Sequence, residues 1–274
     1  TLKYSSNIGV SRIIDKFYHD QPEKFVQKIH SFGLATDYKV PIPGYVPGVI
    51  RMPKKNKRGQ YTNWSKTALP WMSIGYETQI PPLQTVTFYN AIANGGKLVR
   101  PRLVKAIMRD GEVVQEFPVQ VVKEQIAKPQ TIEWIQRILR EVVSEGLGKK
   151  AGSDKFEVAG KTGTAQMSKG ALGYKAGGTK YLLSFAGYFP ADNPLYSCIV
   201  CIQKEGLPAS GGGMSGVVFH NIAEGIMSQI LKVSMEDARD SSSVLLPRVK
   251  EGDLHAADFV LHNLGFDLIN GWKG

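Results

Sequence analysis

The chain has 274 residues, of which 42% are hydrophobic and 21% are charged, a composition that lets a globular protein bury a sizeable core. Its net charge is +10, but no nucleic-acid-binding motif accompanies that charge, so we expect no nucleic-acid partner. The two cysteines and five histidines form no ligand cluster, and no apolar run reaches the length of a membrane span. We therefore expect no metal, no other cofactor and no membrane span in this chain.

The N-terminal segment has helical periodicity. Ser5, Ser6 and Asn7 precede an apolar stripe over residues 8–17. Small polar residues at such a position can cap the free N–H groups of a first helical turn, so the pattern predicts a helix here. A second helix is predicted over residues 22–29.

The central part of the chain alternates between loop and helix signals. Residues 38–70 are rich in proline and glycine, which predicts an extended loop. Residues 83–94 are predicted to form a helix that a glycine pair closes. Residues 102–116 carry an Asp-Gly pair between two apolar runs, which predicts a small hairpin.

The C-terminal half indicates a sheet between two helices. An amphipathic helix around residues 132–142 is followed by strand patterns at 156–166, 181–189 and 195–203. A Pro- and Asn-containing turn joins the last two strands, which suits an antiparallel hairpin. A final helix is predicted over residues 216–231. Helices on either side of a short antiparallel sheet predict a mixed, layered α+β domain.

The composition changes after the final helix. Residues 235–243 are polar and end in three serines, which is typical of a linker. We therefore predict a main domain at residues 1–233, a linker at 234–244 and a short separate unit at 245–274.

Two short motifs carry the chemical signal. The triplet Lys161-Thr162-Gly163 ends a predicted strand, and a Ser-x-Asn triplet formed by Ser5 and Asn7 precedes a predicted helix. Alone, the Lys-Thr-Gly triplet is only moderately specific, since chance would produce it in about one chain of this length in twenty, and a Ser-x-Asn triplet should arise by chance about once in such a chain. Together and in this order, they are similar to two of the three active-site motifs of penicillin-recognising serine enzymes.

The similarity extends beyond the motifs. Residues 69–77 (Leu-Pro-Trp-Met-Ser-Ile-Gly-Tyr-Glu) and 185–190 (Phe-Ala-Gly-Tyr-Phe-Pro) resemble class B penicillin-binding proteins, particularly the division-specific ones. The resemblance runs from residue 1 to about residue 231 and implies the penicillin-binding transpeptidase fold, which β-lactamases share. Residues 246–266 resemble the first half of a PASTA repeat that is cut short at the end of the chain.

The third motif of the family is missing. The family's nucleophile is a serine with a lysine three positions later, and no serine of this sequence has that lysine. The resemblance therefore implies that the chain is the C-terminal part of the domain and that it is inactive by itself. It also implies that the protein acts at the extracytoplasmic face of the bacterial inner membrane, with a membrane anchor outside this chain.

The resemblance implies a role for each motif residue in acyl transfer, with peptidoglycan stem peptides and β-lactams as ligands and cell-division proteins as partners. Ser5 would relay a proton towards the leaving group, because a hydroxyl both donates and accepts. Asn7 would orient the missing lysine and a substrate amide. Lys161 would supply positive charge that holds Ser5 and attracts an anionic substrate terminus.

The rest of the strand motif would bind the substrate. Thr162 and Thr164 lie two apart on a predicted strand, so their hydroxyls share a face and can bind one carboxylate. Gly163 would let a substrate backbone approach closely. The backbone N–H of Thr164 would form half of an oxyanion hole. We further predict an edge strand here, open to a cleft, and a hydrogen bond between Lys161 and Ser5.

Three other interpretations remain. Gly160, Lys161 and Thr162 imitate the end of a phosphate-binding loop, but Lys155 stands where that motif needs glycine and no helix is predicted to follow. A non-catalytic β-lactam sensor or cell-wall-binding module would explain the missing nucleophile. A hydrolytic relative, such as a carboxypeptidase or β-lactamase, fits the central segment less well.

Overall fold

The computed structural model describes residues 1–168, 173–174 and 178–241, and the side chains among them as far as residue 230. The chain divides into two compact units, Thr1–Ile226 and Met227–Gly274, and both sequence motifs lie in the first. The predicted PASTA-like unit at residues 245–274 lies outside the described residues. Among the helices that are described, none combines the length and apolar character needed to cross a membrane.

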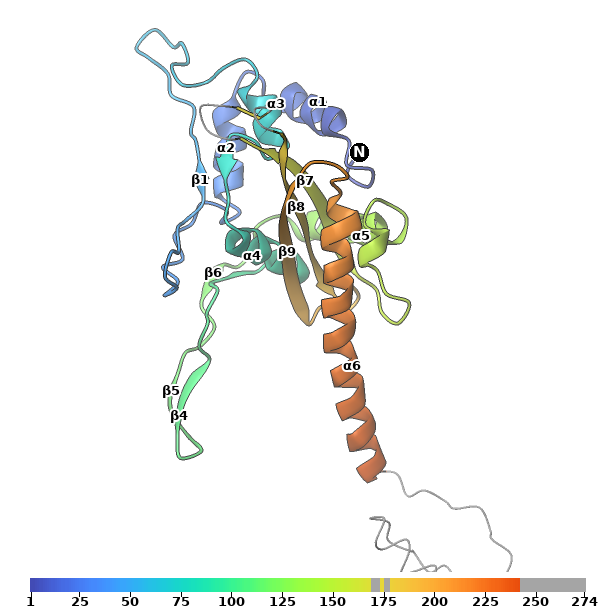
Figure 1. Cartoon of the computed structure of the whole chain (residues 1–274). Helices are drawn as coiled ribbons and strands as arrows, with labels where there is room; N and C mark the ends of the chain where they lie inside the picture. Colours follow the sequence, from blue (N-terminus) through green and yellow to red (C-terminus); the bar gives the residue numbers. More distant parts are fainter. Residues whose placement is uncertain (169–172, 175–177, 242–274) are drawn as a thin grey trace, which may run out of the picture. The chain divides into compact units, whose positions relative to one another are not determined.

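A three-stranded antiparallel sheet forms the centre of the first unit (Figure 1). Its order is β7 (Ala159–Met167), β8 (Lys180–Phe189) and β9 (Tyr196–Glu205). The three predicted strands and their antiparallel hairpin are confirmed. Within the described part of the sheet, β7 pairs with β8 alone, so its other side is an open edge, as predicted.

Alternating side chains of β8 build the two faces of the sheet. On one face, Tyr188 packs in a cluster with residues of α4 (Pro82–Ala93) and α5 (Pro129–Ser144). On the other face, the Phe185 ring lies 4.7 Å from the ring of Phe219 in α6 (Gly216–Ser241). Tyr188 and Phe185 are both almost completely buried, so the sheet is the middle layer of the α+β architecture that the sequence predicts.

The first residues of several helices are explained by proline in the sequence. Three of them have proline within the first turn, where the missing N–H costs no hydrogen bond. The remaining helical segments are α1 (Asn7–Tyr18), α2 (Pro22–His30), α3 (Ala68–Ser73), the 3₁₀ turn η1 (Lys149–Ala151) and the π-helical turn η3 (Gly211–Ser215).

In the part of the chain that the structure describes, three two-stranded ladders lie outside the central sheet. They pair β1 (Val49–Ile50) with β2 (Thr78–Gln79), β3 (Leu98–Val99) with β6 (Val121–Lys123), and β4 (Ala106–Arg109) with β5 (Glu112–Glu116). The last pair confirms the predicted hairpin. Asp110 and Gly111 join its strands with φ angles of 52° and 84°, as a tight turn between twisted strands requires.

Two predicted boundaries are wrong. The strand predicted from residue 156 begins at Ala159, because residues 153–155 form a turn in which the Ser153 hydroxyl accepts the Lys155 backbone N–H. The helix predicted to end near residue 231 continues to Ser241, through most of the predicted linker. Residues 235–239 (Met-Glu-Asp-Ala-Arg) contain several good helix formers, which explains the continuation. The rest of the predicted linker, 242–244, is not described.

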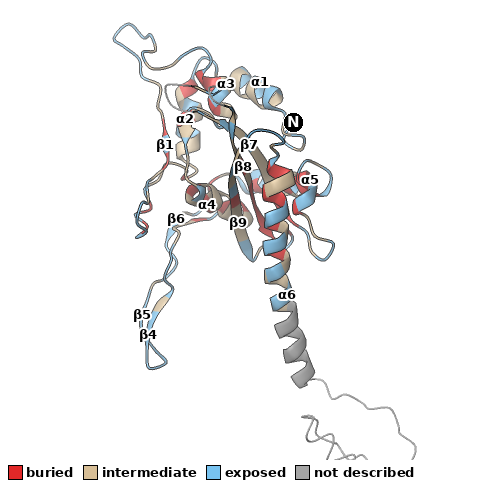
Figure 2. Cartoon of the chain, viewed as in Figure 1, coloured by how far each residue is buried: buried red, intermediate tan, exposed pale blue. Residues whose placement is uncertain are grey.

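Helix α1 carries the Ser-x-Asn motif at its start and contains no buried residue (Figure 2). Its apolar residues Ile8 and Phe17 are 74% and 70% exposed. The helix is held to α3 by Ser11, whose hydroxyl lies 3.2 Å from the Pro70 carbonyl oxygen and 3.2 Å from the Ser73 hydroxyl. The position of the motif therefore depends on α3.

Candidate active site

The two motifs meet at the open edge of β7. The Lys161 Nζ donates a hydrogen bond of 2.8 Å to the Ser5 Oγ, although 156 residues separate the two in sequence. The same nitrogen lies 3.0 Å from the Thr162 carbonyl oxygen and 3.2 Å from the Thr162 Oγ1. The predicted contact between Ser5 and Lys161 is therefore present in the structure.

Strand alternation alone does not explain how the Lys161 ammonium group reaches the open edge of β7, but the path of its side chain does. Lys161 and Thr162 are neighbours on β7, so their side chains leave on opposite faces of the sheet. The Lys161 chain nevertheless turns around the strand edge, where its nitrogen meets the backbone carbonyl and the hydroxyl of Thr162. The ammonium group thus reaches the open edge from the face that packs on α4 and α5.

The adjacent residues Ser5 and Ser6 make different hydrogen bonds. The N-cap of α1 is Ser6, whose Oγ accepts the backbone N–H of Gly9 at 3.1 Å. Ser5 stands one residue earlier with a φ of 51°, in the left-handed region that residues other than glycine rarely occupy. Such backbone strain gathers at functional sites. The hydroxyl of Ser5 is thereby free of the capping role and directed at Lys161.

We expect this division to appear in stability measurements. Ser6→Ala removes the cap and should lower the free energy of unfolding by ~0.5–2 kcal/mol. Ser5→Gly removes a hydroxyl but also relieves the positive φ, so unfolding by denaturant should show no loss of stability. A loss equal to that of Ser6→Ala would instead assign Ser5 a structural role.

Asn7 does not join this contact. It is the first residue of α1 and is exposed. Its side chain makes no hydrogen bond to any group in the part of the chain that the structure describes. The structure therefore brings together Ser5 and Lys161, with Asn7 two residues away at the same helix start, and the orienting role of Asn7 stays a prediction.

The threonine hydroxyls lie on the other face, against η3. The Oγ1 of Thr164 accepts the backbone N–H of Gly211 at 3.0 Å, and the Oγ1 of Thr162 accepts from Lys161. Both hydroxyls act as acceptors in these bonds, so each keeps its own O–H to donate. Gly211 can approach β7 this closely because it has no side chain, since a Cβ at that position would collide with the Gly163 carbonyl oxygen.

At the open edge of β7, every second residue directs its backbone N–H and carbonyl groups away from β8. The Gln166 N–H donates to the Tyr76 hydroxyl at 3.1 Å, and the Thr162 carbonyl accepts from Lys161. In an antiparallel ladder, residues two apart direct their backbone groups to the same side. Thr164 lies midway between these two residues, so its N–H and carbonyl also face the open edge.

Packing inside the protein explains why position 163 of the motif is a glycine. Gly163 pairs with Ser184 on β8, and a Cβ on Gly163 would collide with the Ser184 Oγ. Neighbouring side-chain packing therefore requires glycine here. Room for a substrate backbone, the predicted reason, stays a prediction.

Burial lowers the pKa of the Lys161 ammonium below its ordinary value. No carboxylate offsets that effect, because no salt bridge among the described residues involves Lys161. A partly buried cation without a counter-ion favours the binding of an anion, which would restore the charged form. No three His, Cys, Asp or Glu side chains in the described ranges gather closely enough to hold a metal ion.

The family can now be decided. The model of the penicillin binding protein transpeptidase domain matches residues 1–224, a range that holds both motifs. This chain belongs to the penicillin-binding protein transpeptidase family. The phosphate-binding-loop interpretation is wrong, since β7 continues as a strand to Met167 after the motif.

Relatives within the penicillin-binding protein family are longer than this chain. Penicillin-binding protein PbpB of Mycolicibacterium smegmatis is 28% identical over 235 residues, and stage V sporulation protein D of Bacillus subtilis is 27% identical over 206 residues. These matches cover 82% and 71% of this chain but 34% and 31% of the relatives. The chain therefore spans about a third of their length.

Solved structures of the family agree with the fold. The apo form of penicillin binding protein 3 from Mycobacterium tuberculosis has a TM-score of 0.68 and 29% identity, over 83% of this chain and 50% of that one. The same relative complexed with aztreonam has a TM-score of 0.67 and 30% identity over the same shares.

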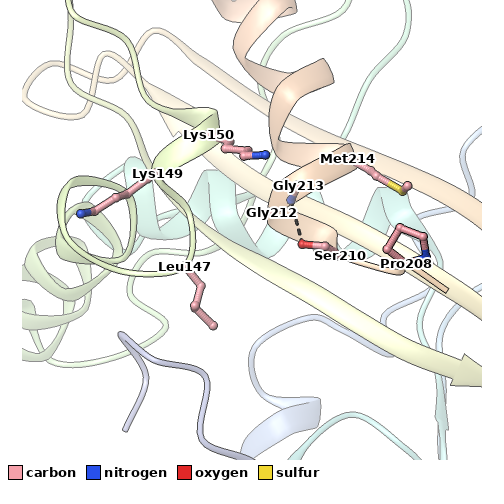
Figure 3. Close-up of a pocket in the computed structure, with 8 residues that line it drawn as sticks. All are labelled: Leu147, Lys149, Lys150, Pro208, Ser210, Gly212, Gly213 and Met214. Carbon is pink, nitrogen blue, oxygen red and sulfur yellow. Dashed lines mark hydrogen bonds between the residues drawn. The ribbon is translucent and has the colours of Figure 1, made fainter.

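A basic pocket of about 380 Å³ lies beside the transpeptidase motif (Figure 3). Lys149 and Lys150 line one side and the turn Ser210–Met214 lines the other, where the Ser210 Oγ accepts the Gly213 N–H at 2.9 Å. Figure 3 shows Lys150 extended towards the glycines and Lys149 directed away. The pocket adds positive charge near Thr162, because a Cβ built on Gly212, which lines the pocket, would lie 3.2 Å from the Thr162 Cγ2.

Sequence reasoning missed two parts of this site. The first is the glycine run 211–213, whose backbone lies directly on β7. Three glycines before a helix are a signal for such close approach. The second is Tyr76, which ends the open edge by bonding the Gln166 N–H. No local pattern predicts that contact, because it joins segments 90 residues apart.

Proposed function

We propose that this chain provides the substrate-binding and β-lactam-binding part of a serine D,D-transpeptidase that cross-links peptidoglycan. The observation that carries the proposal is the 2.8 Å bond between the Lys161 Nζ and the Ser5 Oγ at the open edge of β7. A helix cap needs no distant lysine, and Ser6 already supplies the cap. A proton relay does need one, because positive charge stabilises the hydroxyl oxygen as it gives up its proton.

The substrate peptide would add to the edge of β7 through main-chain hydrogen bonds. Its anionic terminus would meet the Lys161 ammonium and the hydroxyls of Thr162 and Thr164, which still have O–H groups to donate. The Thr164 N–H faces the same edge and would stabilise the tetrahedral oxyanion, a contribution of ~3–4 kcal/mol per donor in acyl-transfer enzymes. Ser5 would then pass a proton towards the leaving group.

The attacking serine and its lysine base are not in this sequence, so the acyl-enzyme forms only with residues that the chain does not contain. The relatives bear on ligands and setting. Penicillin binding protein 3 of M. tuberculosis has been solved in complex with aztreonam and with ampicillin. Another relative is named a peptidoglycan D,D-transpeptidase. By likeness, we place the activity at the extracytoplasmic face of the membrane, with a membrane anchor and cell-division proteins as partners.

We expect no covalent adduct when this chain alone is incubated with a fluorescent penicillin and then denatured, because acylation needs the missing Ser-x-x-Lys nucleophile. Gel fluorescence and mass spectrometry measure the adduct, and a complete penicillin-binding protein serves as the positive control. A label that survives denaturation and maps to Ser5 or another serine of this chain would contradict the assigned roles.

A further inference from the structure

A strongly basic hairpin lies between β1 and α3. Figure 1 shows it as the loop that leaves the end of β1 and returns to α3. Residues 51–67 of this basic hairpin contain six lysine and arginine residues and no aspartate or glutamate. The segment therefore supplies six of the ten net positive charges of the chain. The acyl-transfer scheme above uses none of them.

Asparagine side chains brace the basic hairpin at its tip and at its base. At the tip, the Oδ1 of Asn56 accepts the backbone N–H groups of Arg58 and Gln60 at 2.9 Å and 3.0 Å. At the base, the Oδ1 of Asn63 accepts the backbone N–H of Lys54 at 2.7 Å. A segment whose backbone is fixed in advance loses less conformational entropy when a ligand binds.

Most of the cations on the basic hairpin have no counter-ion. Arg51 forms an ion pair with Glu77, and the Lys55 Nζ lies 3.1 Å from the Glu23 Oε1. In the described ranges, no salt bridge includes the other four cations, which are all exposed: Lys54, Lys57, Arg58 and Lys66. Like charges held together on one hairpin repel one another, and binding of a polyanion would relieve that repulsion.

The aromatic rings of the basic hairpin are already in contact with cations of the protein. The Lys55 Nζ lies 4.6 Å from the centroid of the Tyr61 ring, and the Arg51 guanidinium lies 5.4 Å from that of Trp64. Proteins that bind single-stranded nucleic acid use aromatic faces on which bases can stack. The hairpin therefore does not suit a ligand that is recognised through its bases.

The tip of the basic hairpin also has no apolar side chain to insert into a lipid bilayer. Residues 54–60 (Lys-Lys-Asn-Lys-Arg-Gly-Gln) are charged, polar or glycine, and all of them are exposed. Segments that lie in a membrane interface combine basic residues with large apolar ones. Recognition of repeated negative charge remains, and lysine and arginine bind phosphate groups through charge-assisted hydrogen bonds.

We propose that the basic hairpin binds a linear polymer that carries a phosphate group in each repeat and has no bases. Each of the four unpaired side chains binds one phosphate, so recognition depends on the spacing of negative charge. Such binding would hold the protein on the polymer and leave the contact between Ser5 and Lys161 accessible, because the two sites share no residue. The inference does not depend on the proposed acyl transfer.

The test measures the binding of long-chain inorganic polyphosphate to this chain by calorimetry over a series of NaCl concentrations. Four phosphate contacts release counter-ions, so the logarithm of the dissociation constant should rise with the logarithm of the salt concentration with a slope of about 3. The triple variant Lys54→Gln, Lys57→Gln and Arg58→Gln should bind at least about tenfold more weakly, with a slope of about 1.

The matched control is the triple variant Lys105→Gln, Arg109→Gln and Lys128→Gln. It removes the same number and kinds of exposed cations from other segments, so the net charge of the chain changes equally. We expect this control to retain both the affinity and the slope of the unaltered chain.

Equal weakening by the two triple variants would overturn the proposal, because the net charge of the whole chain would then explain the binding. A slope below about 1 for the unaltered chain would do the same. Tighter binding to phosphatidylglycerol vesicles or to oligodeoxythymidylate than to polyphosphate, at equal phosphate concentration, would identify a membrane or a nucleic acid as the partner and would also overturn the proposal.

Discussion

Replacing Lys161 with alanine should abolish penicillin acylation when this chain is assayed in a protein that also carries the Ser-x-x-Lys motif. The Lys161 ammonium donates to the Ser5 hydroxyl and is the cation nearest to the bound anionic terminus in the proposed scheme. Removing a group that supports proton transfer typically lowers the rate by about 10²–10⁴-fold. The rate of labelling by fluorescent penicillin measures the effect.

The control is Lys180→Ala on the neighbouring strand β8, which removes an exposed lysine paired with Glu205. We expect normal acylation from it. Near-normal acylation by Lys161→Ala would contradict the relay and leave Ser5 without a chemical role.

Lys161→Ala should not weaken the fold by opening an ion pair, because no salt bridge among the described residues includes it. Burial lowers the pKa of Lys161, so the folded state disfavours the charged form. That cost is present in full below the folded-state pKa. This destabilisation is relieved as the pH rises from the folded-state pKa of Lys161 towards its unfolded-state pKa, because in that range the unfolded chain binds more protons than the folded chain. Stability at neutral pH should therefore be retained while acylation is lost, which separates function from folding.

Phe185→Ala should lower the free energy of unfolding by about 3–5 kcal/mol. The Phe185 side chain is completely buried, and it contacts Phe219 on one side. Gly160 lies beneath the ring, where a Cβ would lie 2.6 Å from it. The small neighbour cannot fill the space that the ring leaves, so the cavity persists.

Denaturant titration of Phe185→Ala measures this loss, and Phe17→Ala is the matched control. Phe17 is 70% exposed on α1, so its removal should change stability by ~0.5 kcal/mol or less. A loss below ~1 kcal/mol for Phe185→Ala would show that the α6 face of the sheet is not a tightly packed core.

The sheet could be predicted because its signals are local. Strand-length apolar runs and a proline-containing turn indicate β8 and β9, and the Lys-Thr-Gly triplet marks β7. The Asp110–Gly111 turn could also be predicted from the sequence, since its residue types tolerate positive φ. The end of α6 could not be predicted, because polar residues such as Glu236 suit a linker and a helix alike.

The division of labour between Ser5 and Ser6 could not be predicted. Both are serines before the same helix, and a cap requires only a small polar side chain. What separates them is the positive φ of Ser5, within a turn where its N–H donates to the Leu2 carbonyl. Tyr76 was missed for another reason: its bond to Gln166 joins distant segments, and periodicity reports only on neighbours along the chain.

The length of chain between Ser5 and Lys161 affects how the site assembles. Closing a loop of 156 residues has an entropic cost that local hairpins such as β8–β9 avoid, so the sheet is the part that gains order first. Helix α1 buries no residue, so little apolar burial holds it in place, which puts it at the low-stability end of the molecule. Partial unfolding that releases α1 would separate the Ser5 hydroxyl from Lys161 while the sheet stays intact. We therefore expect the contact between Ser5 and Lys161 to be lost at temperatures where the core is still folded.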